Sequence, residues 1–311
     1  MNRKAIYTIL YGEKYISQWK QYAEPSWRAY AEKHGYDIII VGEPIKQLHS
    51  LAFRAIHWQK LFIPMHPDAG KYDKIVFLDS DIIINYHRAP CIVSANNSDK
   101  IGAVRYDQYI DDSLNYSLIF LRQAKFVNYH MRAEQRKKSP LIKATLSGPA
   151  YDATYREWTD QPEKYPVINS GVIVMDPKNH KDLLAEIYDD SIKEVASDEV
   201  RGKLYEQGYV MYSLLKRNMI NFLDEKFNTI SHLQIPLHYP FLSLIADERL
   251  MQICYTTVLC NAYFMHFAGE ADSMKYAVCS KDNDFAILGL EDVFQDDVEI
   301  IKNHPGRNLR G

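Results

Sequence analysis

The sequence predicts an α/β fold in which helical crossovers join the strands of a parallel sheet. In the first eighty residues, short apolar runs alternate with longer segments of helical spacing, which is the order of β-α-β units. Hydrophobic residues make up 47% of the 311 residues and charged residues 25%, as in ordinary soluble globular proteins. Because no repeat, low-complexity linker or sharp change in composition divides the chain, we expect one domain over residues 1–311, with a mobile tail near 300–311.

The N-terminal part of the chain contains three apolar runs separated by two helical segments. Gly12 ends the first run, and Gly35 is typical of the left-handed cap that closes a helix. Pro67 and Gly70 end the second helical segment. The sequence therefore predicts strands at 5–10, 36–41 and 74–78, and helices at 15–34 and 51–65.

The remaining elements follow from the same patterns, although residues 114–159, rich in Tyr, Arg and Lys, show no clear periodicity. Apolar runs predict four further strands, and helical spacing predicts two further helices. The strands are expected at 100–105, 167–175, 219–223 and 262–267, and the helices near 178–195 and 198–216.

Composition limits the functions that the chain can have. The net charge of −3 gives no general attraction to nucleic acid or to anionic membranes. None of the four cysteines belongs to a Cys-x-x-Cys pair, which argues against a zinc knuckle, and scattered cysteines are typical of a reducing compartment. No apolar stretch is long enough for a signal sequence or a membrane span, so we expect a cytoplasmic protein.

Two carboxylates, Asp79 and Asp81, directly follow the predicted strand at 74–78. Placing two carboxylates between apolar runs is unfavourable unless they are paired or bind a cation. Ligands of open α/β sheets bind at the carboxyl ends of the strands, and hard oxygen ligands there suit Mg²⁺ or Mn²⁺. The sequence thus predicts a metal site at this position, and the alternative is a solvated turn.

Other motifs place polar residues in apolar surroundings. His266 follows a predicted buried strand and would complete the metal site, since imidazole suits Mn²⁺ better than Mg²⁺; the alternative is a structural core histidine. Asn169-Ser170-Gly171 interrupts a strand, which indicates close approach of a ligand or another backbone. Glu206-Gln207-Gly208 stands on an otherwise apolar helix, with a surface turn as the alternative. The segment after the first strand matches neither the dinucleotide fingerprint nor the P-loop, which excludes those enzyme classes.

The order of these motifs resembles the retaining nucleotide-sugar glycosyltransferases of family 8, which include glycogenin and bacterial lipopolysaccharide galactosyl- and glucosyltransferases. The resemblance covers residues 8–275 and depends on four motifs. They are Leu78-Asp79-Ser80-Asp81, Asn169-Ser170-Gly171-Val172, Glu206-Gln207-Gly208, and His266-Phe267-x-Gly269 with Lys275. It implies a GT-A fold, a Rossmann-like mixed and mostly parallel sheet flanked by helices, whose Asp-x-Asp motif holds Mn²⁺, or Mg²⁺ as the alternative, against a nucleotide diphosphate.

The resemblance also implies roles for single residues. Asp79, Asp81 and His266 would be the metal ligands, and Gln207 would act at the reacting face of the donor sugar. The residues that would contact the donor are Thr8, Tyr15, Arg54, Lys60, Ser80, Asn169, Ser170, Gly269 and Lys275.

The implied function is metal-dependent transfer of a hexose from a UDP-sugar to a glycan, glycolipid or other hydroxyl acceptor, with retention of configuration. Two positions depart from the family: Glu206 replaces Asp, and Lys275 is not followed by Pro-Trp. A related retaining family, the galactomannan and xyloglucan transferases, has a similar aspartate strand. Two alternatives stay open: a nucleotidyltransferase, disfavoured by the missing Gly-rich loop, and a non-catalytic carbohydrate-binding relative, disfavoured by the intact ligand set.

Residues 122–143 form a local concentration of basic side chains in which Glu134 is the only acid. One interpretation is a solvated helix face. The other is a docking site for an anionic acceptor, at Arg136, Lys137 and Lys138. The anionic partner would be a phosphorylated lipid-linked glycan or an anionic membrane surface, the latter giving peripheral contact at the inner face of the membrane; the net charge makes nucleic acid the less consistent choice.

Overall fold

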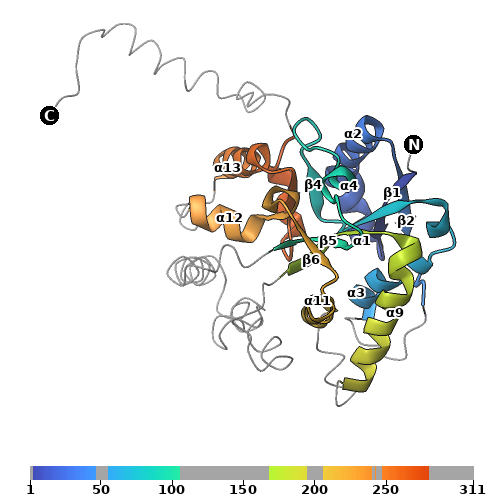
Figure 1. Ribbon diagram of the computed structural model, residues 1–311. Helices are drawn as coiled ribbons and strands as arrows, with labels where there is room; N and C mark the ends of the chain where they lie inside the picture. The colour runs from blue at the N-terminus through green and yellow to red at the C-terminus, as the bar shows by residue number, and fades with distance from the viewer. Residues whose placement is uncertain are drawn as a thin grey trace, which may run out of the picture.

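The computed structural model describes residues 3–46, 55–105, 168–194, 206–239, 242 and 247–279, built around a six-stranded sheet (Figure 1). Within these residues the strand order is β2-β1-β3-β6-β5-β7, and β6 runs antiparallel to both of its neighbours while the other pairs are parallel. The strands are β1 (Lys4–Ile9), β2 (Tyr36–Val41), β3 (Lys74–Leu78), β5 (Ile101–Arg105), β6 (Ile168–Met175) and β7 (Ile220–Leu223). The expected mixed, mostly parallel α/β sheet is confirmed.

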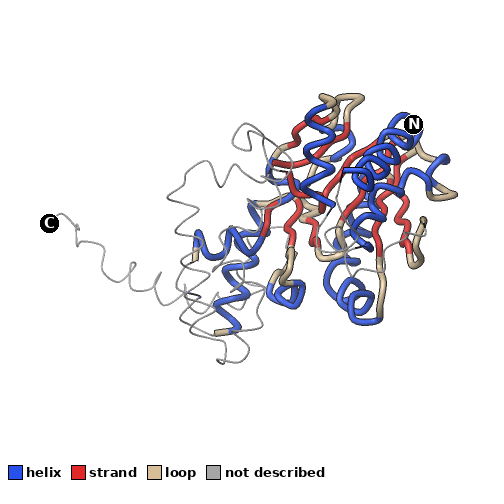
Figure 2. The backbone as a smooth tube through the Cα atoms, turned by 90° about the horizontal axis from the view of Figure 1, so that it is seen from below, coloured by secondary structure: helices blue, strands red, loops and turns tan. Residues whose placement is uncertain are grey.

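Helices cover both faces of this sheet, which is why its strands are continuous apolar runs rather than alternating ones (Figure 2). In β3, Val76 and Leu78 belong to the core shared with α2 (Glu24–His34) and α13 (Glu248–Asn261). The intervening residues Ile75 and Phe77 belong to the opposite core, shared with α9 (Pro177–Glu194) and α11 (Glu206–Lys216). Every side chain named here on β3 is essentially buried.

The first helical segment is interrupted where the sequence predicts one continuous helix. It consists of α1 (Glu13–Gln18), a π-helical turn at Trp19–Ala23, and α2. Pro25 explains the interruption, because it has no N–H to donate to the carbonyl one α-helical turn earlier. Gly35 closes α2 in the left-handed conformation, with φ of 70°, as predicted.

The second predicted helix is mostly a 3₁₀ segment. It begins as α3 (Ala55–Trp58) and continues as a 3₁₀ helix at Gln59–Met65, which contains Pro64. The missing N–H of that proline again disfavours regular α-helical bonding. The helices predicted near 178–195 and 198–216 are confirmed as α9 and α11 within the described residues.

A second, three-stranded sheet lies beside the first. The sequence predicted one of its strands, at 262–267, but not the sheet itself. It brings Ile82 opposite His266, and the Phe267 N–H donates to the Asp81 carbonyl at 2.9 Å. Its strands, in the order β4-β9-β8, are β4 (Ile82–Ile84), β9 (Phe264–His266) and β8 (Thr229–Ile230). The remaining α-helices of the described residues are α4 (Ile92–Ala95) and α12 (Ser231–His238). The two apolar runs that flank Asp79 and Asp81 therefore belong to different sheets.

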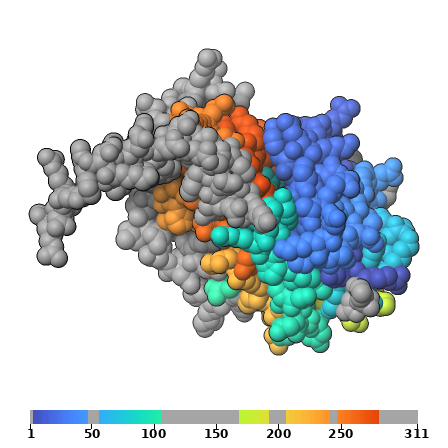
Figure 3. Space-filling view, turned by 90° about the horizontal axis from the view of Figure 1, so that it is seen from above, coloured from blue at the N-terminus to red at the C-terminus, as the bar shows by residue number. Residues whose placement is uncertain are grey.

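The C-terminal elements pack against the first helices of the chain, where orange-red atoms meet blue ones in Figure 3. Asp272, in a 3₁₀ turn at Ala271–Tyr276, accepts a hydrogen bond from Gln18 and lies 3.5 Å from the Lys14 ammonium. In the described parts of the chain, no helix combines the length and apolarity needed to cross a membrane. Residues 114–159 and the predicted tail lie outside the described residues.

Candidate metal centre

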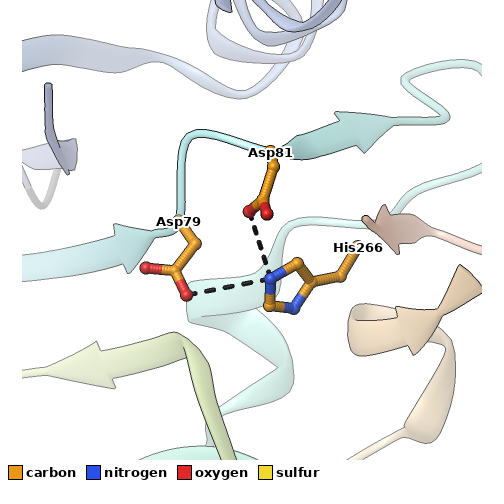
Figure 4. Close-up of side chains that lie close together, drawn as sticks. All are labelled: Asp79, Asp81 and His266. Carbon is orange, nitrogen blue, oxygen red and sulfur yellow. Dashed lines mark ion pairs between the residues drawn. The ribbon is translucent and has the colours of Figure 1, made fainter. Parts of the chain in front are cut away.

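Asp79, Asp81 and His266 lie together at the junction of the two sheets (Figure 4). Their ligand atoms all lie within 4.8 Å of one another. His266 Nε2 is 3.1 Å from Asp81 Oδ1 and 3.7 Å from Asp79 Oδ2. The carboxylates come from the turn between β3 and β4, and the imidazole comes from β9, so the cross-sheet register brings together residues that are remote in sequence.

The site combines a buried imidazole with carboxylates that reach solvent. The His266 side chain is 2% exposed, whereas those of Asp79 and Asp81 are 28% and 21% exposed. Burial alone would lower the pKa of His266, but Asp81 and Asp79 raise it above its ordinary value. Burial would likewise raise the pKa of Asp81, and His266 holds it below its ordinary value. Without a metal, the two carboxylates therefore favour the protonated form of His266 more than its burial disfavours that form.

This ligand set fits a divalent cation. Two carboxylates and one imidazole are a donor set that Mn²⁺ accepts, and the nitrogen of His266 faces both carboxylates. Because the carboxylates remain partly exposed, an ion held there would keep open positions for oxygens of a ligand. Asp79, Asp81 and His266 could therefore hold the expected metal.

Lys60 connects this centre to the start of α11. Its buried ammonium lies 3.1 Å from Asp79 Oδ1 and 3.1 Å from Glu206 Oε1, and donates to Ser170 Oγ at 3.3 Å. Burial would lower the pKa of Lys60, but Asp79 and Glu206 raise it above its ordinary value. Burial would raise the pKa of Glu206, and Lys60 keeps it below its ordinary value. The cation is thus shared between the metal centre and Glu206.

Glu206 and Gln207 are buried beside β6, which excludes the alternative of a surface turn. The Ser170 hydroxyl donates to Glu206 Oε1 at 2.6 Å, and the Ser170 N–H donates to Gln207 Oε1 at 3.1 Å. These bonds fix the first turn of α11 against the strand that runs next to Asp79. The amide oxygen of Gln207 already has one donor in this arrangement.

Gly171 is required by the position of the imidazole. A Cβ on this residue would lie 2.3 Å from His266 Cε1 and 2.7 Å from its Nδ1. The carbonyl of Gly171 also accepts the Asp79 N–H at 2.8 Å. The glycine predicted to mark close approach therefore marks the contact between β6 and the metal-site histidine.

Of the remaining residues predicted to contact the sugar donor, only some lie near the candidate metal centre. Thr8 is fully buried, and Tyr15 is exposed. Ser80 and Gly269 lie next to the site in sequence, and Gly269 has a positive φ of 75°. Lys275 is 3.5 Å from Glu248 and lies over the Tyr276 ring, and no described contact joins it to the metal ligands. Arg54, Arg136, Lys137 and Lys138 lie outside the described residues.

Sequence reasoning missed several residues of this region. Asn228, whose Oδ1 accepts a hydrogen bond from His266 Nδ1 at 3.0 Å, lies in a 3₁₀ turn without a recognisable motif. Glu270 accepts a hydrogen bond from Ser231 near the site, and burial raises its pKa to about 7. Tyr11 carries a buried hydroxyl without a partner among the described residues, and its position after β1 was the one available signal.

Comparisons with known proteins find solved structures that this chain resembles, but no matching sequence family. No family model and no curated protein matches the sequence. A glycosyltransferase involved in glycosylation of the major capsid of PBCV-1 has 14% identity and a TM-score of 0.48, over 88% of this chain and 98% of that one. Galactosyltransferase LgtC, in complex with donor and acceptor sugar analogues, has 11% identity and a TM-score of 0.41, over 91% and 99%. GlyE of Streptococcus pneumoniae has 13% identity and a TM-score of 0.40, over 96% and 64%.

The three solved structures named above are glycosyltransferases.

Proposed function

We propose that the chain is a metal-dependent glycosyltransferase that moves a hexose from a UDP-sugar to a hydroxyl acceptor with retention of configuration. The observation that carries the proposal is the convergence of Asp79, Asp81 and His266 at the carboxyl edge of a mostly parallel sheet. That edge is where open α/β sheets bind ligands. The sugar, the acceptor and the stereochemistry come from the resemblance of the motifs.

The metal would be Mn²⁺, with Mg²⁺ as the alternative, held by Asp79, Asp81 and His266. When bound, such an ion neutralises a leaving diphosphate as a Lewis acid. The chain has no glycine-rich phosphate loop after β1, so another source of positive charge is needed there. Lys60 contributes a fixed positive charge next to Asp79, and its ammonium is held in place by its ion pair with Glu206.

Orphaned polar atoms at the end of β1 support a nucleotide site. Thr8 Oγ1 and Tyr11 Oη are buried and have no hydrogen-bond partner among the described residues. Most buried polar groups of folded proteins are paired, so such atoms are candidates for contacts with a ligand. Tyr15, one helical turn further on, presents an exposed ring for stacking on a base.

We assign Gln207 and Ser170 to the lining of the donor-sugar pocket. The assignment is supported by the hydrogen bond from the Ser170 N–H to Gln207 Oε1 and by Lys60, which contacts both Ser170 Oγ and Asp79. A neutral amide is a poor nucleophile. The role we assign to Gln207 is stabilisation of positive charge at the anomeric carbon through its oxygen. The acceptor hydroxyl would enter on the face from which the diphosphate leaves, with a phosphate oxygen taking its proton.

The test combines binding and turnover. The parent chain should show a rise in melting temperature with UDP only when Mn²⁺ is present, and should release UDP from one member of a UDP-sugar panel. Asp81→Ala should abolish both effects. Asp189→Ala is a matched control, because Asp189 is exposed and pairs with Lys46 at 3.8 Å on the surface. UDP affinity that is equal in parent and Asp81→Ala, with and without Mn²⁺, would refute the assignment.

The same assay separates the alternatives. A nucleotidyltransferase would form a nucleotide sugar from a sugar phosphate and a nucleoside triphosphate, and would leave UDP-sugars intact unless pyrophosphate is added. A binding protein without activity would show the metal-dependent shift in melting temperature and no release of UDP.

A further inference from the structure

A chain of buried hydrogen bonds runs from the backbone of β6 to the imidazole of His266. The Gly171 N–H donates to Asn169 Oδ1 at 2.9 Å. Asn228 contacts the same Oδ1 at 2.9 Å and the Asn169 carbonyl at 3.5 Å through its Nδ2. The other end of the Asn228 amide, its Oδ1, lies 3.0 Å from His266 Nδ1. Both asparagines are buried, with 8% and 3% of their surface exposed.

The direction of every bond in this chain follows from its first member. A backbone N–H can only donate, so the Asn169 atom that faces Gly171 must be the oxygen. That oxygen can only accept, so the Asn228 atom that faces it must be the NH₂ group, as the second contact with a backbone carbonyl also requires. The oxygen of Asn228 then faces His266, and His266 Nδ1 must carry a proton.

We infer that Asn169 and Asn228 are positioning residues that keep the proton of neutral His266 on Nδ1, so that the lone pair on Nε2 is the one presented to the metal. Nε2 is the ring nitrogen that faces Asp81 and Asp79. Metal-bound histidines commonly donate their other ring N–H to an oxygen, which fixes the tautomer and the ring orientation. In this protein the acceptor is the Asn228 amide oxygen. Asn228 is oriented by Asn169, which is in turn oriented by the Gly171 N–H of β6.

The ring cannot easily take another orientation. Its Cε1 and Nδ1 lie close to the position that a Cβ of residue 171 would occupy, so β6 limits the ring on one face. The backbone of His266 is fixed by pairing with Ile82. The inference deepens the metal-binding part of the proposed function and rests on it, so its test measures the binding of the metal alone.

The first experiment measures Mn²⁺ affinity without substrate, by electron paramagnetic resonance of the free ion. Asn228→Ala removes the acceptor for Nδ1–H and should weaken Mn²⁺ binding about 10- to 100-fold, the usual effect of losing such a partner. Asn169→Asp retains the acceptors for both Gly171 and Asn228, so it should bind Mn²⁺ no more weakly than the parent. Asn96→Ala is the control, because Asn96 is equally buried and makes two side-chain hydrogen bonds far from the ligands.

Equal Mn²⁺ affinity in Asn228→Ala and the parent overturns the inference while leaving the proposed function intact. A loss of Mn²⁺ affinity in Asn169→Asp as large as that in Asn228→Ala overturns it as well. Mn²⁺ binding would then not depend on the hydrogen-bond acceptors that residue 169 offers to Gly171 and Asn228. A parent chain that binds no divalent cation overturns both proposals.

A second measurement needs no substitution, and so does not depend on folding of the variants. The parent chain is labelled with ¹⁵N-histidine and loaded with diamagnetic ¹¹³Cd²⁺ as the probe. The inference predicts a ¹¹³Cd–¹⁵N coupling to Nε2 of His266 and a proton on its Nδ1. A coupling to Nδ1, or an Nδ1 without a proton, would contradict it.

Discussion

Gly171→Ala is the most direct test of how the metal centre is built. The added Cβ would lie 2.3 Å from His266 Cε1, 2.7 Å from His266 Nδ1 and 2.8 Å from Asn169 Oδ1, where ordinary van der Waals contact begins at 3.4 Å. Relief of the closest contact therefore requires a displacement of about 1 Å. Neither partner is the free end of a flexible chain, because the ring and the amide are both hydrogen-bonded and buried.

The size of this displacement determines how far the Mn²⁺ affinity and the free energy of unfolding should fall. Metal–ligand distances tolerate changes of about 0.2 Å, so a shift of about 1 Å should remove His266 from coordination or strain it. We expect at least a tenfold loss of Mn²⁺ affinity, equivalent to about 1.4 kcal/mol. Overpacking of a buried site should also lower the free energy of unfolding by about 1 to 3 kcal/mol.

The assay is Mn²⁺ titration together with urea unfolding in the absence of metal. Gly102→Ala is the matched control, since its Cβ would lie 2.9 Å from the Asn96 side chain and 3.1 Å from Val174 in the same sheet, away from the ligands. The control should lose stability and keep its Mn²⁺ affinity. If Gly171→Ala binds Mn²⁺ as tightly as the parent, or if both variants lose affinity equally, the reasoning about the ring contact is wrong.

Three other substitutions test the surroundings of the site. Lys60→Met leaves Glu206 buried without its cation, so the free energy of unfolding at pH 7 should fall by about 3 kcal/mol. That loss should shrink when the pH drops below the ordinary carboxyl pKa of 4.5, as urea titrations at pH 7 and pH 4 would show. Burial raises the pKa of Glu270 to about 7, so the folded state keeps a proton that the unfolded chain releases above 4.5. The contribution of Glu270 to the stability of the metal-free parent should therefore fall by about 3 kcal/mol as the pH rises from about 4.5 to about 7, and calorimetry of Glu270→Gln should show that this contribution has gone. Gln207→Ala should lower kcat with little change in donor KM; an unchanged kcat would exclude Gln207 from the reaction.

Local sequence patterns were sufficient for the elements of the main sheet. The run at residues 74–78 is apolar because helices cover both faces of its strand, and Gly35 could be assigned because few residues adopt a left-handed cap. Pro25 and Pro64 are present in the sequence, but their effect on the helices could not be predicted from it. Whether a proline produces a π turn, a 3₁₀ segment or a kink depends on how the helix packs against the rest of the fold.

The three residues of the candidate metal centre could be identified from the sequence, whereas the residues that support them could not. Asp79, Asp81 and His266 belong to motifs with a recognisable order. Asn228 has no such motif, and its role depends on a contact with a strand far away in sequence. The burial of Glu206 was also hidden, since a charged residue at the start of a helix is ordinarily exposed and only the buried Lys60 makes its position favourable.

The antiparallel direction of β6 also determines where the chain can vary in length. Arg105 at the end of β5 is paired with Ile168 at the start of β6, so residues 106–167 leave and re-enter the sheet at neighbouring points of the edge that holds Asp79. The entropy of closing a loop rises only with the logarithm of its length, by about 0.6 kcal/mol for each doubling. Exchange of this connection for one of very different length should thus cost the sheet little. At this edge, the chain can change in length while Asp79, Asp81, His266 and the two cores stay in place.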